Sequence, residues 1–336
     1  MASNGKKRVL VTGATGMIGR QVAAALQSQD FGVLRALVRD RVEAREKCGD
    51  VFDFANTEFH QSDFERMLEQ DHRELTRGCN IVIHAAGLAH KPDAPYQEYE
   101  VANVRATQAL AEACAVNQVD TFVFFSSSAV YGPGPFSNVP ETAPLKAKTP
   151  YAVSKAASES FLKTVQGIPR VIILRPSLVF GEGDRGNLIK MIQEIKSHRY
   201  KHIGQASTEK SLIYTKDLAR AVLLCLQRVP EGHHVFNVAN PQAVSIHDLA
   251  EEISKALEND KKIPSVPEGL LKFGVKMAET FMPGKAPVTT EQLEKLTTET
   301  TCSIAKLVQT TGFKPRMSLS SALKAEIHWA EENKLL

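Results

Sequence analysis

The sequence predicts an α/β protein, a doubly wound parallel sheet with a smaller, mainly helical C-terminal lobe, and three observations support this fold class. Short continuous apolar runs recur along the first two thirds of the chain, and such runs are typical of strands buried on both faces of a parallel sheet. Segments with helical periodicity separate these runs, as in strand–helix–strand units. From Ser245 onward, helical segments joined by proline-containing links replace the strands.

The composition is that of an ordinary globular protein, with 43% apolar and 24% charged residues. The 41 basic and 38 acidic residues are intermixed, so the chain has no electrostatic footprint for nucleic acid. No segment approaches the length of a membrane span, and the first apolar run stops at Thr12, too early for a signal peptide. We therefore expect a cytoplasmic protein with neither nucleic acid nor membrane as a partner.

Neither the cysteines nor the histidines show the spacing of a metal site. The five cysteines are scattered and never form a CxxC pair, which also argues against a disulfide framework. Two histidine groups, His198 with His202 and the adjacent pair 233–234, lack carboxylate or cysteine partners nearby in the sequence. We therefore predict no bound metal and reduced thiols.

A glycine-rich turn follows the first apolar run, Val9 to Val11, and leads into a helical segment. A strand, a glycine turn and a helix in this order are the context of a dinucleotide fingerprint in a Rossmann fold. The first glycine permits a tight turn, the second lets the backbone approach a pyrophosphate, and the third allows close packing of helix on strand. The predicted pyrophosphate site comprises Gly13, Thr15, Gly16, Met17, Ile18 and Gly19.

The end of the next strand, Val33 to Val38, indicates which dinucleotide is preferred. It lies about 20 residues beyond the last glycine, where a residue that reads the adenosine ribose is expected. An acid there would bind the 2′-hydroxyl of NAD, whereas an arginine would accommodate the 2′-phosphate of NADP. Because Arg39 follows the strand directly and Arg41 adds positive charge, we favour NADP, with NAD as the alternative through Asp40.

Two later segments carry candidate catalytic groups. Tyr151 and Lys155 are four residues apart in a predicted helix that starts near Pro150, so they share one helix face. A nearby ammonium stabilises a phenolate and lowers the phenol pKa toward the working pH of an acid/base catalyst. The apolar strand 121–125 ends in serines, and a hydroxyl at the carboxyl end of such a strand is well placed to donate to a substrate oxygen.

Several motifs together resemble one family. They are TGATGMIG at residues 12–19, SSAVYG at 127–132, YAVSK at 151–155, LRPSLVFGEGD at 174–184 and KSLIYTKDLA at 210–219. In this order they resemble the extended short-chain dehydrogenases/reductases of the NAD-dependent epimerase/dehydratase type, and the similarity covers essentially the whole chain.

The resemblance implies roles for the candidate catalytic residues. Tyr151 would exchange a proton with a substrate hydroxyl or carbonyl while hydride passes between that carbon and the nicotinamide. Ser127 would orient the same oxygen, with Ser128 as the alternative. Lys155 would hold the nicotinamide ribose, and Asn103 would support a proton-relay water, although a polar residue in mid-helix could instead face solvent.

The resemblance also implies further binding residues. Around the cofactor it adds Asp63 near the adenine, Phe64, Ala85, Ala86, Gly87 and Pro176. His84, which precedes the alanines, is expected to be a packed and hydrogen-bonded histidine. The predicted substrate residues are Ser128, Ser177, Asn187 and Lys210. Lys210 stands where nucleotide-sugar enzymes often have arginine, and Ser177 where sugar epimerases often have asparagine.

The predicted large lobe binds the dinucleotide and comprises residues 1–176 and 211–244, and the substrate lobe comprises 177–210 and 245–336. The favoured activity is that of a nucleotide-sugar 4-epimerase or 4-ketoreductase, in a homodimer packed through the Asn103 and Tyr151 helices. A reductase of a hydrophobic ketone or alcohol, of the hydroxysteroid or flavonol type, is the first alternative, which an apolar predicted helix over 269–281 would suit. A non-catalytic NADP-binding sensor or assembly protein is the second.

Overall fold

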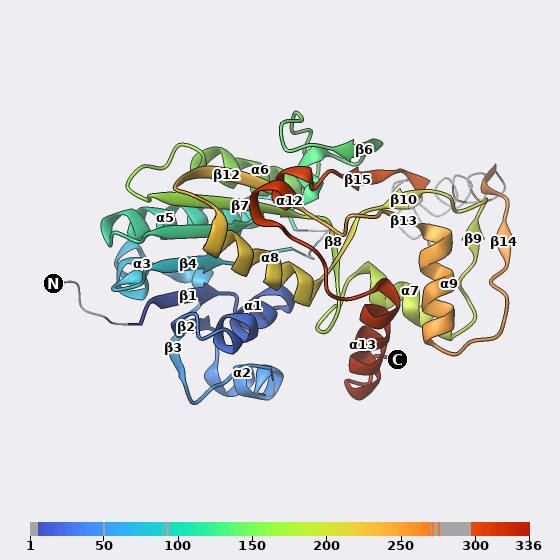
Figure 1. Ribbon diagram of the computed structural model, residues 1–336, viewed down its shortest axis with the longest axis horizontal. Helices are drawn as coiled ribbons and strands as arrows, with labels where there is room; N and C mark the ends of the chain where they lie inside the picture. The colour runs from blue at the N-terminus through green and yellow to red at the C-terminus, as the bar shows by residue number, and fades with distance from the viewer. Residues whose placement is uncertain are drawn as a thin grey trace.

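The computed structural model describes residues 6–49, 51–89, 91, 94–269, 271, 275 and 297–336. Its centre is a seven-stranded parallel sheet in the order β3-β2-β1-β4-β5-β7-β12, which confirms the predicted fold class (Figure 1). The strands are β1 (Arg8–Thr12), β2 (Val33–Val38), β3 (Thr57–Gln61), β4 (Ile81–His84), β5 (Thr121–Phe125), β7 (Arg170–Pro176) and β12 (Gly232–Val238).

Helices cover both faces of this sheet, so each strand contributes to two cores. Helices α1 (Met17–Ser28) and α8 (Thr215–Arg228) pack on one face, and α3 (Glu69–Thr76), α5 (Ala106–Val116) and α6 (Pro150–Leu162) on the other. In β1, Val9 and Val11 belong to the first core and Leu10 to the second, because successive side chains of a strand point to opposite faces. This two-sided burial explains the continuous apolar runs in the sequence.

The strand order reverses between β1 and β4, its neighbour in the sheet. From β1 the chain moves outward through β2 and β3, and it then returns to the other side of β1 to form β4. Ligands of open α/β sheets bind beyond the carboxyl ends of the strands at such a reversal. The glycine turn after β1 and the alanines after β4 both lie there.

The small lobe buries its own core between three helices, α7 (Asn187–Lys196), α9 (Ile246–Ala256) and α13 (Leu319–Glu332), on the right of Figure 1. Short strands, not predicted from the sequence, complete it. A four-stranded sheet has the order β13 (Val244–Ser245), β10 (Glu209–Lys210), β15 (Thr300–Cys302), β6 (Phe136–Val139), and β9 (His202–Ile203) pairs with β14 (Ser265–Val266). Strands of two to four residues are too short to show a period in the sequence.

A pair of parallel strands, β8 (Leu178–Phe180) and β11 (Leu212–Tyr214), links the two cores. Ile213 belongs to the core of the large lobe, whereas Leu212 and Tyr214 on either side of it belong to the core of the small lobe. The alternation along one strand therefore joins the lobes through shared packing.

The predicted lobe boundary needs one correction, because residues 304–313 pack on the large lobe and not on the substrate lobe. Helix α12 (Ala305–Thr311) lies against α8 and β12, and Ile304, Leu307 and Phe313 are part of the large-lobe core. The buried carboxylate of Asp217 in α8 accepts a hydrogen bond from the backbone N–H of Arg316 at 2.8 Å, where the chain leaves for α13. An amphipathic helix shows its apolar face in the sequence but not the core that receives it.

The predicted helix over 290–296 and nearly all of the one over 269–281 lie outside the described residues. Within the described residues, the remaining short elements are α2 (Arg41–Cys48), α4 (Tyr96–Tyr99) and three single-turn helices, η1 (Phe64–Arg66), η2 (Glu100–Arg105) and η3 (Ser128–Tyr131). In the part of the chain that is described, no helix has the length and apolar character needed to cross a membrane.

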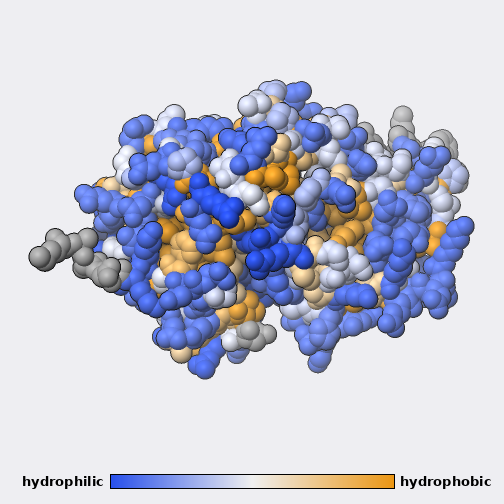
Figure 2. All heavy atoms as spheres, in the orientation of Figure 1, coloured by the Kyte–Doolittle hydropathy of each residue, from blue (hydrophilic) through white to orange (hydrophobic). Residues whose placement is uncertain are grey.

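Hydrophilic residues dominate the face shown in Figure 2, and apolar residues form separate areas between them.

Replacing Leu307 by alanine tests the corrected boundary. Leu307 is fully buried, so Leu307→Ala should lower the free energy of unfolding by about 2–5 kcal/mol in urea denaturation. Gln309→Ala, on the exposed side of the same helix, should change it by less than about 0.5 kcal/mol. Equal, small effects of the two substitutions would show that α12 does not contribute to the large-lobe core.

Candidate active site

Each glycine of the turn after β1 is needed for a different structural reason. Gly13 has a φ of +66°, and a Cβ there would lie 2.7 Å from the backbone nitrogen of Ala86. A Cβ on Gly19 would lie 2.0 Å from the carbonyl oxygen of Gly13, so this glycine permits the close approach of α1 to the turn. Gly16 is exposed at the start of α1, and a Cβ there would meet only the Gly13 oxygen, at 3.2 Å. The backbone at the α1 N-terminus is thus open to an anion.

The other predicted residues of this turn are neither fully buried nor fully exposed. Thr15, Met17 and Ile18 are partly buried, and Ile18 packs against the large-lobe core. Beyond β2, Arg39 and Asp40 are both exposed, and the Asp40 carboxylate accepts a hydrogen bond from the Glu43 N–H at 2.8 Å as the cap of α2.

The segment after β3 carries Asp63 and Phe64, which the resemblance places at the cofactor. The Asp63 carboxylate accepts from the Glu65 N–H at 3.4 Å and is only partly buried. The ring of Phe64 is buried, with its centroid 5.0 Å from that of His84. The Phe64 side chain therefore packs in the core.

His84 is a structural histidine, as predicted. Its Nδ1 lies 2.7 Å from the Thr12 hydroxyl and its Nε2 lies 2.9 Å from the Thr107 hydroxyl. Burial holds the pKa of His84 well below its usual value, and the charge of Lys155 acts in the same direction. The ring is therefore neutral and joins β1, β4 and α5.

Asn103 connects the end of β4 to α6. Its Oδ1 accepts from the Leu88 N–H at 2.7 Å, and its Nδ2 donates to the Leu88 carbonyl at 3.0 Å and to the Ser154 hydroxyl at 2.9 Å. The residue is 1% exposed, so the alternative in which it faces solvent is wrong. It lies in the π-helical turn η2, a feature often found at functional sites.

Gly87 lies between Asn103 and Lys155. With a φ of +153°, a Cβ at Gly87 would be 2.8 Å from Asn103 Oδ1 and 3.6 Å from Lys155 Nζ. The backbone after β4 therefore approaches both side chains closely, and a larger residue would displace them. Ala85 and Ala86 hydrogen-bond through their N–H groups to the carbonyl and the hydroxyl of Thr12, respectively.

Lys155 is buried, and its ammonium donates to the Phe125 carbonyl at 2.8 Å. Nζ also lies 4.7 Å from the ring centroid of Phe124 and 6.0 Å from that of Tyr151. Burial lowers the pKa of Lys155 to about 8, although the Glu159 carboxylate acts in the opposite direction. The position of Lys155 on α6 is thus fixed by the end of β5.

Tyr151 does not have the lowered pKa expected from its spacing to Lys155. Burial raises its pKa and outweighs the hydrogen bond with Ser127, which lowers it. The reason is the placement of Lys155, whose ammonium is held by Phe125 and Phe124 and not directed to the phenol. The structure brings Ser127 to Tyr151, and Ser127 Oγ also accepts from the Ala129 N–H at 3.2 Å.

A buried ion pair under this site was not predicted. Arg175 from β7 donates to both carboxylate oxygens of Glu159, at 2.9 and 2.5 Å, and the two side chains are 1% and 0% exposed. Glu159 also accepts from the Ser126 hydroxyl at 2.6 Å. The sequence contained the signal, an arginine at the end of an apolar strand and a glutamate four residues after Lys155.

The same network extends to the neighbouring strands. Arg175 donates to the Tyr131 hydroxyl at 2.8 Å, which in turn donates to Asn237 Oδ1 at 2.7 Å. Asn237 Nδ2 donates to the Val139 carbonyl at 2.9 Å. The network therefore ties α6, β7 and β12 to the segment that carries β6.

The predicted substrate residues lie in several elements. Pro176, the last residue of β7, and Ser177 directly after it are buried, and the Ser177 hydroxyl has no hydrogen-bond partner among the described residues. Asn187 is exposed at the first position of α7. Lys210, on β10, donates to the Thr298 carbonyl, and burial lowers its pKa to about 8.

Comparison with known proteins places this site in context. The family model described as the NAD dependent epimerase/dehydratase family matches residues 9–239. A UDP-glucose 4-epimerase of Vibrio cholerae is 25% identical over 330 residues, which cover 95% of this chain and 94% of that protein. A 4-hydroxy-2-methyl-3-oxo-4-farnesyl-3,4-dihydroquinoline-1-oxide ketoreductase of Stigmatella aurantiaca is 28% identical over 237 residues, 68% of this chain and 67% of that protein.

Among solved structures, a UDP-glucuronic acid 4-epimerase from Bacillus cereus in complex with NAD matches with a TM-score of 0.78. The match covers 97% of this chain and 99% of that chain at 21% sequence identity, so it supports the fold.

Removing the charge of Glu159 tests the buried ion pair. Glu159→Gln should lower the free energy of unfolding by about 3–5 kcal/mol, because it leaves the buried Arg175 guanidinium without its counter-charge. Lys163→Ala removes the second, 41% exposed cation beside Glu159 and should cost no more than about 1 kcal/mol. The double variant Glu159→Leu, Arg175→Met should recover much of the loss. If Glu159→Gln were as stable as the wild type, the pairing with Arg175 would be contradicted.

Proposed function

The chain belongs to the NAD-dependent epimerase/dehydratase family, and on that premise we propose that it is a nucleotide-sugar 4-epimerase. The observation that carries the proposal is the meeting of Ser127, Tyr151 and Lys155 beside Gly87, near the point where the strand order reverses. A proton-transfer pair at a dinucleotide site suits the removal and return of hydride at a carbon that bears oxygen.

Each catalytic residue has a part that its surroundings support. In the first step hydride leaves a carbon that bears a hydroxyl, so Tyr151 must take up the hydroxyl proton, while Ser127 hydrogen-bonds the same oxygen. In the return step the neutral phenol, the form that burial favours, gives the proton back to that oxygen. To act as a base, Tyr151 must lose its proton, which a positive charge beside it would favour. Lys155 supplies such a charge when protonated and would bind the ribose hydroxyls, and Asn103 positions the backbone around Gly87. A bound nicotinamide supplies the hydride acceptor and donor.

The cofactor is proposed to be bound by the glycine turn and the ends of β2 and β4. Gly13, Gly16 and Gly19 would hold the pyrophosphate, with Thr15, Met17 and Ile18 beside it, and the alanines after β4 would pass along the nicotinamide half. Asp63, the backbone of Phe64, and Pro176 complete the proposed set.

The substrate would lie between the Tyr151 helix and the small lobe. Ser177 offers a buried hydroxyl without a partner among the described residues, and Ser128 and Asn187 offer further hydrogen bonds. Lys210 is proposed to face the diphosphate, although an ammonium cannot grip it bidentately as an arginine would. A homodimer through the Asn103 and Tyr151 helices remains a prediction.

A reductase of a hydrophobic ketone is the second candidate. It is favoured by the similarity to the Stigmatella aurantiaca ketoreductase, whose named substrate carries a farnesyl group. The two candidates differ in what happens to the dinucleotide. An epimerase returns its hydride to the same sugar and consumes no cofactor, whereas a reductase consumes one reduced dinucleotide per turnover.

We propose NAD as the working cofactor, in place of the NADP preference suggested by Arg39. The family description names NAD, and the exposed Asp40 carboxylate follows Arg39 directly. Under this proposal the wild type binds NADH at least about tenfold more tightly than NADPH, as measured by fluorescence titration. Arg39→Ala should leave the NADH dissociation constant within twofold. Tighter NADPH binding that Arg39→Ala abolishes would restore the NADP assignment.

Replacing Tyr151 by phenylalanine tests the catalytic assignment. With UDP-glucose and UDP-glucuronic acid as test substrates, Tyr151→Phe should lower turnover by about 10²–10⁴-fold while NAD binding changes little, because only the group that takes up and returns the proton is lost. Turnover is measured as interconversion of the 4-epimers by NMR. Tyr99→Phe is the matched control, since the Tyr99 ring lies beside Tyr151 but its hydroxyl donates to the Lys91 carbonyl.

The outcomes separate the candidates. Full turnover by Tyr151→Phe would rule out the assigned proton transfer. If neither sugar nucleotide is converted but the protein reduces a polycyclic ketone with NADH or NADPH, and Tyr151→Phe loses that reduction, the second candidate is supported. Bound dinucleotide without activity on either class would favour a non-catalytic dinucleotide-binding protein.

A further inference from the structure

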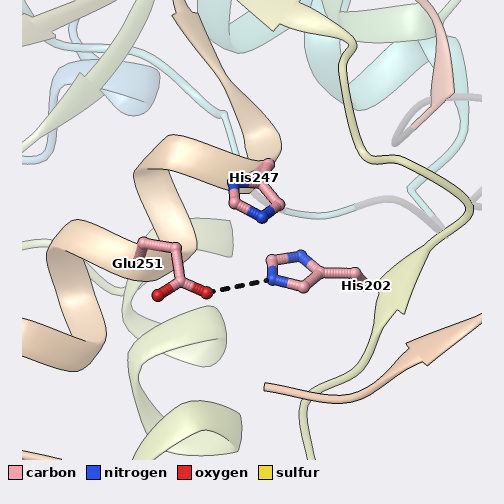
Figure 3. A group of neighbouring side chains, drawn as sticks. All are labelled: His202, His247 and Glu251. Carbon is pink, nitrogen blue, oxygen red and sulfur yellow. Dashed lines mark hydrogen bonds and ion pairs between the residues drawn. The ribbon is translucent and has the colours of Figure 1, made fainter. Parts of the chain in front are cut away.

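Two histidines and a glutamate meet in the small lobe, in a cluster that the proposed reaction does not use. His202 comes from β9, and His247 and Glu251 come from the first two turns of α9 (Figure 3). Each side chain offers one ligand atom, and these three atoms lie within 4.8 Å of one another. The sequence predicted no metal site because His202 is separated from its partners by more than 40 residues, and only the fold brings them together.

His202 is buried but not satisfied as a purely structural histidine would be. Its side chain is 5% exposed and its Nδ1 has no hydrogen-bond partner among the described residues. His84, by contrast, has a partner for each ring nitrogen. The open Nδ1 is not the nitrogen that meets Glu251, so it does not itself mark the position of an ion. With its proton on Nδ1, the neutral ring leaves Nε2 free to bind a metal.

The geometry around His202 resembles the spacing of metal ligands more than that of a good hydrogen bond. Its Nε2 lies 3.4 Å from Glu251 Oε1, which is long for a hydrogen bond. Ligand atoms of a tetrahedral zinc ion are about 3.3 Å apart, given zinc–nitrogen and zinc–oxygen distances near 2.0–2.2 Å. The imidazole of His247 is stacked on that of His202, with ring centroids 4.6 Å apart, so a rotation of His247 must accompany binding. His247 is 48% exposed, which leaves room for this rotation.

We propose that His202, His247 and Glu251 form a binding site for one zinc ion, with water as the fourth ligand. Two imidazoles and one carboxylate are a ligand set that zinc uses, whereas magnesium and calcium prefer oxygen ligands alone. The ion would connect β9 to α9 and so stiffen the small lobe.

The charges around the cluster permit a cation. The α9 N-terminus carries a partial positive charge that opposes one, but Glu251 and Asp248 both lie in the first two turns. The Asp248 carboxylate is 3.5 Å from His247 Nδ1, so it can orient this imidazole and leave Nε2 for the ion. Tyr200 packs edge-on against the other side of His202, with ring centroids 5.7 Å apart.

Zinc titration of the full chain, first treated with a chelator, tests the site. Isothermal titration calorimetry with Zn²⁺ should give one ion per chain, and Co²⁺ should give the visible absorption of a tetrahedral complex. His247→Ala should weaken Zn²⁺ binding at least tenfold, since even the loss of a side chain that only supports a ligand costs about 10–100-fold. Zn²⁺ should also raise the melting temperature of the wild type, and less so that of the variant.

His328→Ala is the matched control. His328 and Glu332 are also four residues apart on a helix, 3.3 Å from each other, but they are exposed and belong to no described group of three ligands. This variant should bind Zn²⁺ like the wild type, and Mg²⁺ should not compete. The proposal would be overturned if the wild type bound no Zn²⁺, or bound it without a one-to-one stoichiometry. It would also be overturned if His247→Ala bound Zn²⁺ as tightly as the wild type, or if His247→Ala and His328→Ala lost affinity for Zn²⁺ equally. Because the His247 side chain is about half exposed, its substitution tests the ligand without emptying the core.

Discussion

The buried ion pair between Arg175 and Glu159 is the interaction on which the site depends. Two charges in the interior are stable only when they are paired and their remaining hydrogen-bonding atoms are used. Here the guanidinium binds both carboxylate oxygens and the Tyr131 hydroxyl, and the carboxylate also accepts from Ser126. Because removal of either partner would leave a buried charge, this arrangement holds α6 against β5 and β7 in a single position.

That position determines where the side chains of α6 lie. Glu159 lies one turn after Lys155 on α6. The ion pair that fixes Glu159 therefore also fixes the position of Lys155 along the helix axis, next to the end of β5. Tyr151, one turn before Lys155, is then brought to Ser127. The network would thus act on the proposed acid/base pair through the helix that carries it.

Without a bound ligand, the surroundings of Tyr151 and Lys155 favour the neutral form of both groups. Burial raises the pKa of Tyr151 and lowers that of Lys155 to about 8, so both groups are shifted toward their neutral forms. Positive charge beside Tyr151 would reverse the first shift, and negative charge beside Lys155 would reverse the second. A dinucleotide site next to this pair suits that requirement, and the pair alone does not meet it.

The sequence by itself determined the doubly wound sheet, the glycine turn and the spacing of Tyr151 and Lys155. These features follow from local rules, namely two-sided burial of strands, backbone freedom at Gly13 and the repeat of a helix. The structural role of His84 could also be predicted, because a histidine within a buried strand has to find partners there. The very short strands of the small lobe carry no readable pattern.

Only the tertiary structure decided the direction of the Tyr151 pKa shift, the pairing of Arg175 with Glu159 and the place of residues 304–313 in the large-lobe core. It also decided that His202 meets His247 and Glu251. Each of these depends on the distance between residues far apart in the chain and on the water removed around them. Sequence periodicity shows that a face is apolar, but it does not specify which surface covers that face or which charge is buried beside it.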